Sequence, residues 1–132
     1  MDEQREKLIA DSFFIKDKRE RALYELNSKK KRREFIFKLS EKIILAERAH
    51  KIKDSIVSFE NIENVLLDRQ APNECYVLSI DEDIDGKIMT LHEALSRVVG
   101  FGPALISCID GRLAYLECEQ SQGAPERFIL IA

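Results

Sequence analysis

The stretch ALISCIDGRLAYLECE, residues 104–119, decides the fold of this chain. Two β-prone runs, residues 104–109 and 112–119, flank the dipeptide Asp110-Gly111. Asp-Gly between such runs is typical of a type I′ β-hairpin, because both central positions of that turn need positive φ angles. We therefore expect an antiparallel hairpin here. After a loop at 120–125, the run at 127–132 extends the hairpin to a three-stranded meander.

A fourth strand and a short helix come before the hairpin. The run CYVLSI, residues 75–80, has the composition of a strand and is expected to pair with the meander. Thr90 and Glu93 have the spacing of a capping box, in which the Thr side chain caps a helix start. This box predicts a short helix over residues 91–99, which Gly100 ends.

The first half of the chain predicts helices. Asp17, followed by Glu20, matches an N-terminal cap and predicts a helix over residues 18–26. A second apolar face with three- and four-residue spacing begins near residue 29 and comprises Phe35, Ile36, Leu39 and Ile43. The pattern leaves open whether this second helix continues to residue 53 or breaks near Ser40.

A third helix completes the expected set of elements. Ser58 is placed to cap it, and it should end before Pro72, because the residue before a proline disfavours helical angles. We therefore predict an α+β fold in which N-terminal helices pack on a small, mostly antiparallel sheet of about four strands with one short inserted helix. We expect residues 1–132 to form a single domain, mainly helical over 1–70 and mainly β over 71–132.

Charge divides the chain at the same place as secondary structure. Residues 1–60 hold 16 Lys and Arg against 12 Asp and Glu, a net charge of +4. Residues 61–132 hold 5 against 12, a net charge of −7, so the chain carries −3 overall. The sequence therefore predicts a basic surface on the helices and an acidic surface on the strands.

The expected location follows from composition. The first seven residues are densely charged, and no apolar run approaches the roughly 20 residues of a membrane helix. Cys75, Cys108 and Cys118 are odd in number, lack metal-binding spacing and lie in apolar runs, which is typical of buried, reduced thiols. We expect a cytoplasmic protein without a disulfide framework or an association with membranes.

The strongest surface signal is the basic segment, residues 29–33, which consists of Lys29, Lys30, Lys31, Arg32 and Arg33. Residues 16–33 hold nine basic and three acidic side chains. Such a surface can contact an acidic protein or the phosphates of nucleic acid. A solvated face that only keeps the domain soluble is the simplest alternative.

The acidic turn, residues 81–86, has the sequence DEDIDG and resembles the start of a calcium loop. Asp81, Asp83 and Asp85 have the required alternation, but His92 stands where the bidentate Glu should be. A strand also precedes the turn instead of a helix. We therefore interpret these residues as a turn after a strand and expect no metal and no other cofactor.

No combination of residues indicates catalysis. His50, expected on or near the second helix, and His92 show no spacing to the cysteines that suits a nucleophilic pair or a zinc site. Glu117 and Glu119 lie on one face of a strand, which we interpret as the solvent face of the sheet. Tyr115 shares that face and is either a half-buried strand residue or an aromatic anchor for a protein partner.

These observations favour a non-catalytic, cytoplasmic domain that binds another protein. One concrete version is a neutralising, immunity-type protein that masks a basic toxin with its acidic strand half. The alternatives are a nucleic-acid or phosphate binder acting through residues 29–33 and an uncharacterised enzyme, and a homodimer also stays open. The candidate binding residues are Lys29, Lys30, Lys31, Arg32, Arg33, Asp81, Asp83, Asp85, Tyr115 and Glu117.

Overall fold

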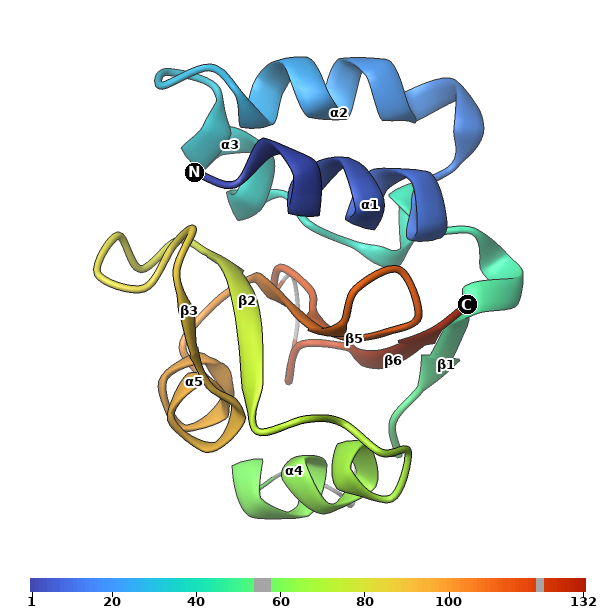
Figure 1. The fold of residues 1–132 in the computed structure, drawn as a ribbon, viewed down its shortest axis with the longest axis vertical. Helices are drawn as coiled ribbons and strands as arrows, with labels where there is room; N and C mark the ends of the chain where they lie inside the picture. Colours follow the sequence, from blue (N-terminus) through green and yellow to red (C-terminus); the bar gives the residue numbers. More distant parts are fainter. Residues whose placement is uncertain (54–57, 121–122) are drawn as a thin grey trace.

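An antiparallel sheet with the strand order β1-β6-β5-β4-β2-β3 forms the middle layer of the molecule (Figure 1). The computed structural model describes residues 1–53, 58–120 and 123–132, and residues 121 and 122 of the loop expected at 120–125 lie outside this part. The strands are β1 (Ala49–Lys51), β2 (Glu74–Ser79), β3 (Ile88–Thr90), β4 (Ala104–Ile109), β5 (Leu113–Glu117) and β6 (Arg127–Ile131).

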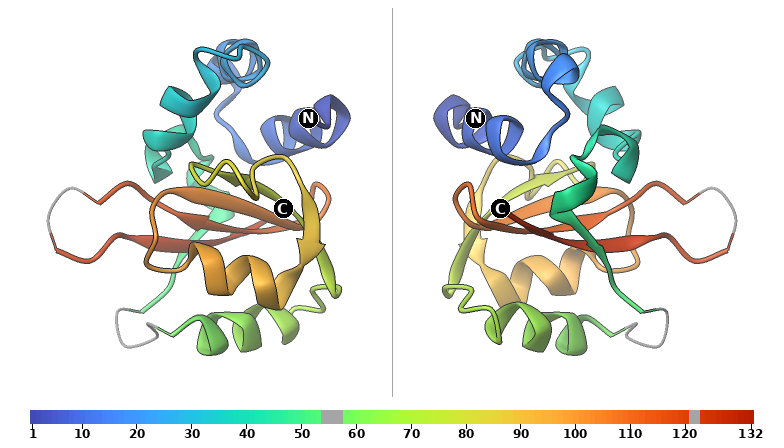
Figure 2. Two further views of the ribbon diagram at one scale, coloured as in Figure 1. Left: turned by 90° about the vertical axis from the view of Figure 1, so that its left-hand side faces the viewer. Right: turned by 90° about the vertical axis from the view of Figure 1, so that its right-hand side faces the viewer.

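Helices cover both faces of the sheet (Figure 2). One layer consists of α1 (Glu3–Phe13), α2 (Arg19–Leu26) and α3 (Arg32–Phe37), and the other of α4 (Phe59–Leu67) and α5 (Leu91–Val98). Short 3-10 helices at Lys16–Lys18, Glu41–Ile43 and Ala46–Arg48 lie in the connections of the first layer. No helix of the described residues is long and apolar enough to cross a membrane.

Two apolar cores fill the spaces on either side of the sheet. In β2, Tyr76 and Leu78 pack with the α1–α3 layer, whereas Cys75 and Val77 pack with α4 and α5. Successive strand residues point to opposite faces, so a strand covered on both sides is apolar at most positions, and its polar side chains need partners within the protein. This requirement explains why the strand runs of this chain show no alternation of polar and apolar residues.

The α+β class is confirmed, but the sheet has six strands where the sequence predicted about four. The two additional strands, β1 and β3, are three-residue edge strands. β1 lies where the longer version of the second helix would run, so the version with a break is correct. Ser40 marks that break, because its side chain accepts a hydrogen bond from the Lys42 amide and opens a 3-10 helix.

The predicted helix caps have mixed outcomes. Ser58 and Thr90 cap α4 and α5 as expected, by accepting hydrogen bonds from the amides of Asn61 and Glu93. Asp17 does not cap α2, because it lies inside a 3-10 helix that runs directly into α2. Helix α1 was not predicted from the sequence.

The hairpin between β4 and β5 exists, but its turn differs from the type I′ prediction. Ile109 pairs with Leu113, so the loop has three residues and the ladder shifts register next to it. Gly111 has a φ angle of 73°, whereas Asp110 is not among the described residues with positive φ. One glycine in the left-handed region is typical of a three-residue hairpin loop.

The Thr90 cap gives a test of this local structure. We expect Thr90→Ala to lower the free energy of unfolding by about 1 kcal/mol, because the Glu93 amide loses its acceptor. Thr90→Ser keeps the hydroxyl and is the matched control. Urea denaturation followed by circular dichroism measures both values, and equal losses in the two variants would contradict the capping role.

Candidate functional site

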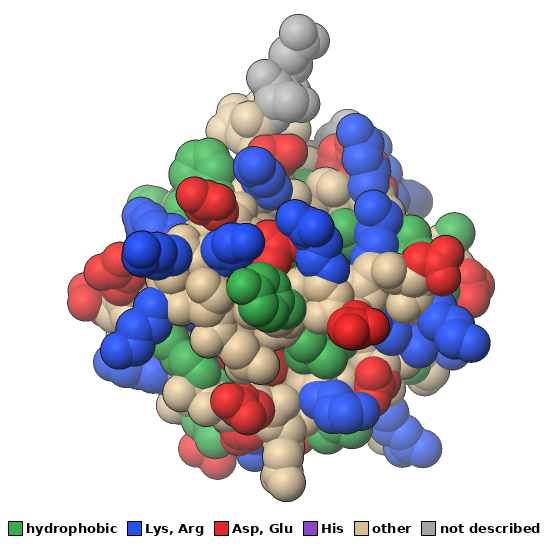
Figure 3. Space-filling view, turned by 90° about the horizontal axis from the view of Figure 1, so that it is seen from above, with side chains coloured by type: hydrophobic (Ala, Val, Ile, Leu, Met, Phe, Trp, Pro, Cys, Tyr) green, Lys and Arg blue, Asp and Glu red, His purple; other side chains and the backbone are tan. Residues whose placement is uncertain are grey.

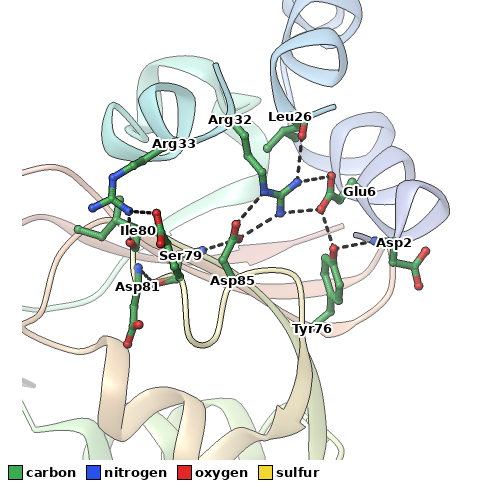
Figure 4. A network of polar contacts seen from close by, with 11 residues as sticks. Asp2, Glu6, Leu26, Arg32, Arg33, Tyr76, Ser79, Ile80, Asp81 and Asp85 are labelled. Atoms are coloured by element: carbon green, nitrogen blue, oxygen red, sulfur yellow. Dashed lines mark hydrogen bonds and ion pairs between the residues drawn. The ribbon is translucent and has the colours of Figure 1, made fainter. Parts of the chain in front are cut away.

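Arg32 lies at the centre of a buried polar network (Figure 4). Its side chain is only 8% exposed. The guanidinium contacts Asp85 twice, at 2.7 and 3.1 Å, and Glu6 twice, at 2.9 and 2.8 Å. A fifth contact, of 3.0 Å, joins it to the carbonyl oxygen of Leu26. Four of these contacts are hydrogen bonds and the 2.8 Å contact with Glu6 is an ion pair, so all three guanidinium nitrogens are engaged by groups of the chain itself.

The network continues from Arg32 into the sheet. The Tyr76 hydroxyl donates to Glu6 over 2.6 Å, and the amide of Ser79 donates to Asp85 over 3.1 Å. Burial alone would lower the pKa of Arg32, but its hydrogen bonds with the two carboxylates outweigh burial and raise that pKa. Burial, together with the bond to Glu6, raises the pKa of Tyr76, which therefore keeps its proton. The network joins α1, α3, β2 and the loop between β2 and β3.

The acidic turn is held by arginines on both sides. Arg33 donates to the carbonyl oxygen of Ile80 over 2.7 Å and approaches the exposed side chain of Glu82 to 3.4 Å. From α5, Arg97 lies 3.0 Å from Asp81 and 3.7 Å from Asp83. The basic segment and the acidic turn, which we considered as separate binding surfaces, therefore contact each other. Arg32 and Asp85 are paired with each other in that contact, so their charges do not face a partner.

The possible metal and catalytic residues do not come together. Within residues 1–53, 58–120 and 123–132, no three His, Cys, Asp or Glu side chains are placed to hold a metal ion. His50 lies in strand β1 rather than on the second helix. His92 contacts Glu63 at 2.8 Å and packs against the ring of Phe59. The three cysteines are free and buried.

Tyr115 and Glu117 are fully buried, so the interpretation of their strand face as a solvent face is wrong. β5 lies between β4 and β6, and helices cover both sides of the sheet. Glu117 accepts hydrogen bonds from the Tyr115 hydroxyl at 2.8 Å and from Arg127 at 2.9 Å. Its other oxygen accepts from the amide of Gly100 at 2.9 Å. Of the acidic pair predicted on this strand, only Glu119 is exposed.

The outward side of the basic segment remains available. Lys29, Lys30, Lys31 and Arg33 are exposed, and the Lys31 ammonium lies 5.3 Å from the centre of the exposed Tyr24 ring. In the described part of the chain, neither Lys29 nor Lys30 forms an ion pair. Figure 3 shows this helical face, with Lys and Arg side chains spread over it and acidic side chains between them.

A cleft of about 500 Å³ separates the α2–α3 corner from the acidic turn. Its charged lining residues are Lys29, Arg32, Arg33, Glu3, Glu82 and Asp85. Arg32 and Asp85 are bonded to each other here, whereas the Lys29 and Glu3 side chains line the cleft without an ion pair among the described residues. Comparisons with protein-family models, with curated proteins and with solved structures find no match for the chain. The function must therefore be inferred from surface geometry.

Removing Arg32 tests whether the network holds the fold together. We expect Arg32→Met to lower the free energy of unfolding by about 3–5 kcal/mol, because two buried carboxylates lose their cation. Arg33→Met removes a neighbouring, half-exposed arginine and should cost less than about 1 kcal/mol. Chemical denaturation measures both. If Arg32→Met lowered the free energy of unfolding as little as Arg33→Met does, the network would not hold the fold together.

The thiols give a pH-dependent test. Burial raises the pKa of Cys75 and of Cys118 to about 12, with Glu74 and Glu41 adding to the shift. The thiols of the unfolded chain have a pKa of about 8.5. Above that pH the unfolded chain loses these protons while the folded chain keeps them, so the free energy of unfolding should be constant below about pH 8.5 and fall as the pH rises toward 12. At pH 8 we expect no reaction of the native protein with a thiol reagent and full reaction in denaturant. Rapid native labelling would contradict this burial.

Proposed function

We propose that this protein is a non-catalytic domain that binds an acidic surface of another protein through its basic segment. The observation that carries the proposal is the set of exposed cations at Lys29, Lys30, Lys31 and Arg33, beside an exposed Tyr24. Tyrosine and arginine are enriched among the side chains that dominate protein interfaces. Cations around an aromatic ring suit a partner that offers carboxylates.

The acidic strand half offers fewer free groups than the basic segment. Glu117 is buried in an ion pair within the chain, Asp85 is partly buried in one, and Asp81 is paired with Arg97. Glu82, Asp83 and Glu119 remain exposed. A neutralising role that depends on the acidic half therefore has weaker support than binding through the basic segment.

The buried network supports binding by holding the basic segment in place. Arg32 is fixed by contacts to α1 and to the acidic turn, its neighbour Lys31 is exposed, and Arg33 is held against the Ile80 carbonyl oxygen. A surface that is ordered before binding loses less conformational entropy when the partner arrives. This arrangement favours a specific docking surface over a face that only keeps the protein soluble.

The kind of partner and the location follow from the same surface. Glu25 and Glu34 lie close to the basic segment in the chain, and the net charge is −3, whereas nucleic-acid-binding domains are usually strongly basic over a whole face. We propose a cytoplasmic location, which the free, buried thiols support because such thiols are typical of a reducing compartment.

Charge reversal tests this proposal. The tagged chain captures its partner from a nuclease-treated lysate of its native cells near physiological salt, with mass spectrometry as the readout. We expect Lys29→Glu with Lys30→Glu to lower partner recovery at least about tenfold, because repulsion replaces attraction. Lys51→Glu with Lys53→Glu is the matched control, since it makes the same charge change at the opposite edge of the sheet.

The outcomes of this capture are distinct. Loss of a protein partner in the first variant but not in the control supports the proposal. Equal recovery from both variants, or an empty capture with the wild-type chain, contradicts it. Material that is recovered only when the nuclease is omitted, and that depends on residues 29–33, would instead support the nucleic-acid alternative.

A further inference from the structure

Phe101 projects from the turn that follows α5. Its side chain is 72% exposed, the largest value among the large apolar side chains of the described residues. A single exposed apolar residue on a surface needs no explanation by itself. Phe101 differs from a chance exposed residue in two respects: hydrogen bonds and close packing fix the turn that carries it, and the neighbouring surface is hollowed.

The turn that carries Phe101 is fixed at several points. The buried carboxylate of Glu117 accepts the amide hydrogen of Gly100 at 2.9 Å, and the Phe101 amide donates to the Val98 carbonyl at 3.0 Å. Gly102 has a φ angle of 122° and lies so close to Ile80 that a Cβ atom there would be 2.5 Å from the Ile80 Cδ1 atom. Phe101 is therefore presented by an ordered turn and not by a loose loop.

The surface beside Phe101 continues to α3. A hollow of about 460 Å³ next to Phe101 is lined by Ile80 and Arg97, among others. Arg33 reaches the carbonyl oxygen of Ile80 from the other side, and Phe37, 54% exposed, lines a second hollow together with Arg33. We call this continuous strip, from Phe37 across Arg33 and Ile80 to Phe101, the Phe37–Phe101 surface.

Charge indicates what this surface can bind. The hollow at Phe37 is lined by three basic side chains, Lys30, Arg33 and Lys38, and by one acidic side chain, Glu34, a net charge of +2. At the Phe101 end, Arg97 lies 3.0 Å from Asp81 and 3.7 Å from Asp83, so these three side chains carry a net charge of −1 and this end does not attract further carboxylates. A partner that complements this strip needs carboxylates near Phe37 and apolar side chains around Phe101.

We infer that the Phe37–Phe101 surface is the docking site for an acidic, partly apolar segment of a partner protein, with Phe101 as its preformed aromatic anchor. This inference rests on the proposed function and deepens it, because it extends the contact beyond the basic segment to the strand half. Rigid aromatic side chains that fill a pocket on the partner contribute most of the energy in typical interfaces. The buried Glu117 acts as a positioning residue for that anchor.

Site-specific photo-cross-linking tests the inference even while the partner is unidentified. The photoreactive amino acid p-benzoylphenylalanine replaces Phe101, Phe37 or Leu67 in full-length chains that are made in the native cells. Leu67 is the matched control, since it is also an exposed large apolar residue but lies on α4, outside the two hollows that define the Phe37–Phe101 surface. We expect an ultraviolet-dependent protein adduct from positions 101 and 37 with at least about five times the yield from position 67.

The composition of the adduct decides the chemistry of the partner. Mass spectrometry of the cross-linked peptide should show a segment rich in Asp and Glu, and Lys30→Glu with Lys38→Glu should reduce the yield at position 101. Equal yield from position 67, a neutral or basic segment, a second copy of this chain or nucleic acid in the adduct would each overturn the inference. If the basic segment proves necessary for capture but position 101 yields no adduct, the proposed function survives and this inference fails.

Discussion

The contact of Arg32 with Glu6 and Asp85 is the interaction on which the arrangement of the helical layer depends. Each of these carboxylates would be costly to bury alone, and a guanidinium that meets both in bidentate fashion offsets much of that penalty. The contact ties α1 and α3 to the loop after β2, elements that are far apart in the chain. It therefore holds the start of α3, and with it the basic segment, against the acidic turn.

A second network, around Glu117, likewise pairs a buried carboxylate with an arginine, on the opposite face of the sheet. Arg127 balances its charge, and the Gly100 amide uses the remaining oxygen. Buried ion pairs of this kind often add little net stability compared with apolar packing, but they restrict which arrangements of the chain are acceptable. In this molecule, each network fixes a segment that carries exposed side chains, the basic segment in one case and the Phe101 turn in the other.

Local signals in the sequence predicted much of the fold, whereas the site depends on contacts that they do not contain. The caps at Ser58 and Thr90 and the Asp-Gly hairpin are readable because each depends on residues within a few positions. Arg32 and Asp85 are 53 residues apart, and the sequence around each residue gives no indication of the other. Glu117 was misplaced for a related reason, since a strand covered by helices on both faces can bury a carboxylate beside an arginine from the next strand.

These contacts show how the opposite charges of the two halves of the chain are used in the folded protein. Part of the acidic excess is used inside the molecule by Arg32, Arg97 and Arg127, so the exposed lysines of the basic segment are not cancelled by the overall charge. Arg33 links the two proposed contact regions, because it lines both the cleft beside Lys29 and the hollow beside Phe37. A single partner that covers both regions would be attracted by charge at one end and held by aromatic burial at the other. Salt should therefore slow its association more than it speeds its dissociation, since exposed charges govern encounter while buried anchors govern release.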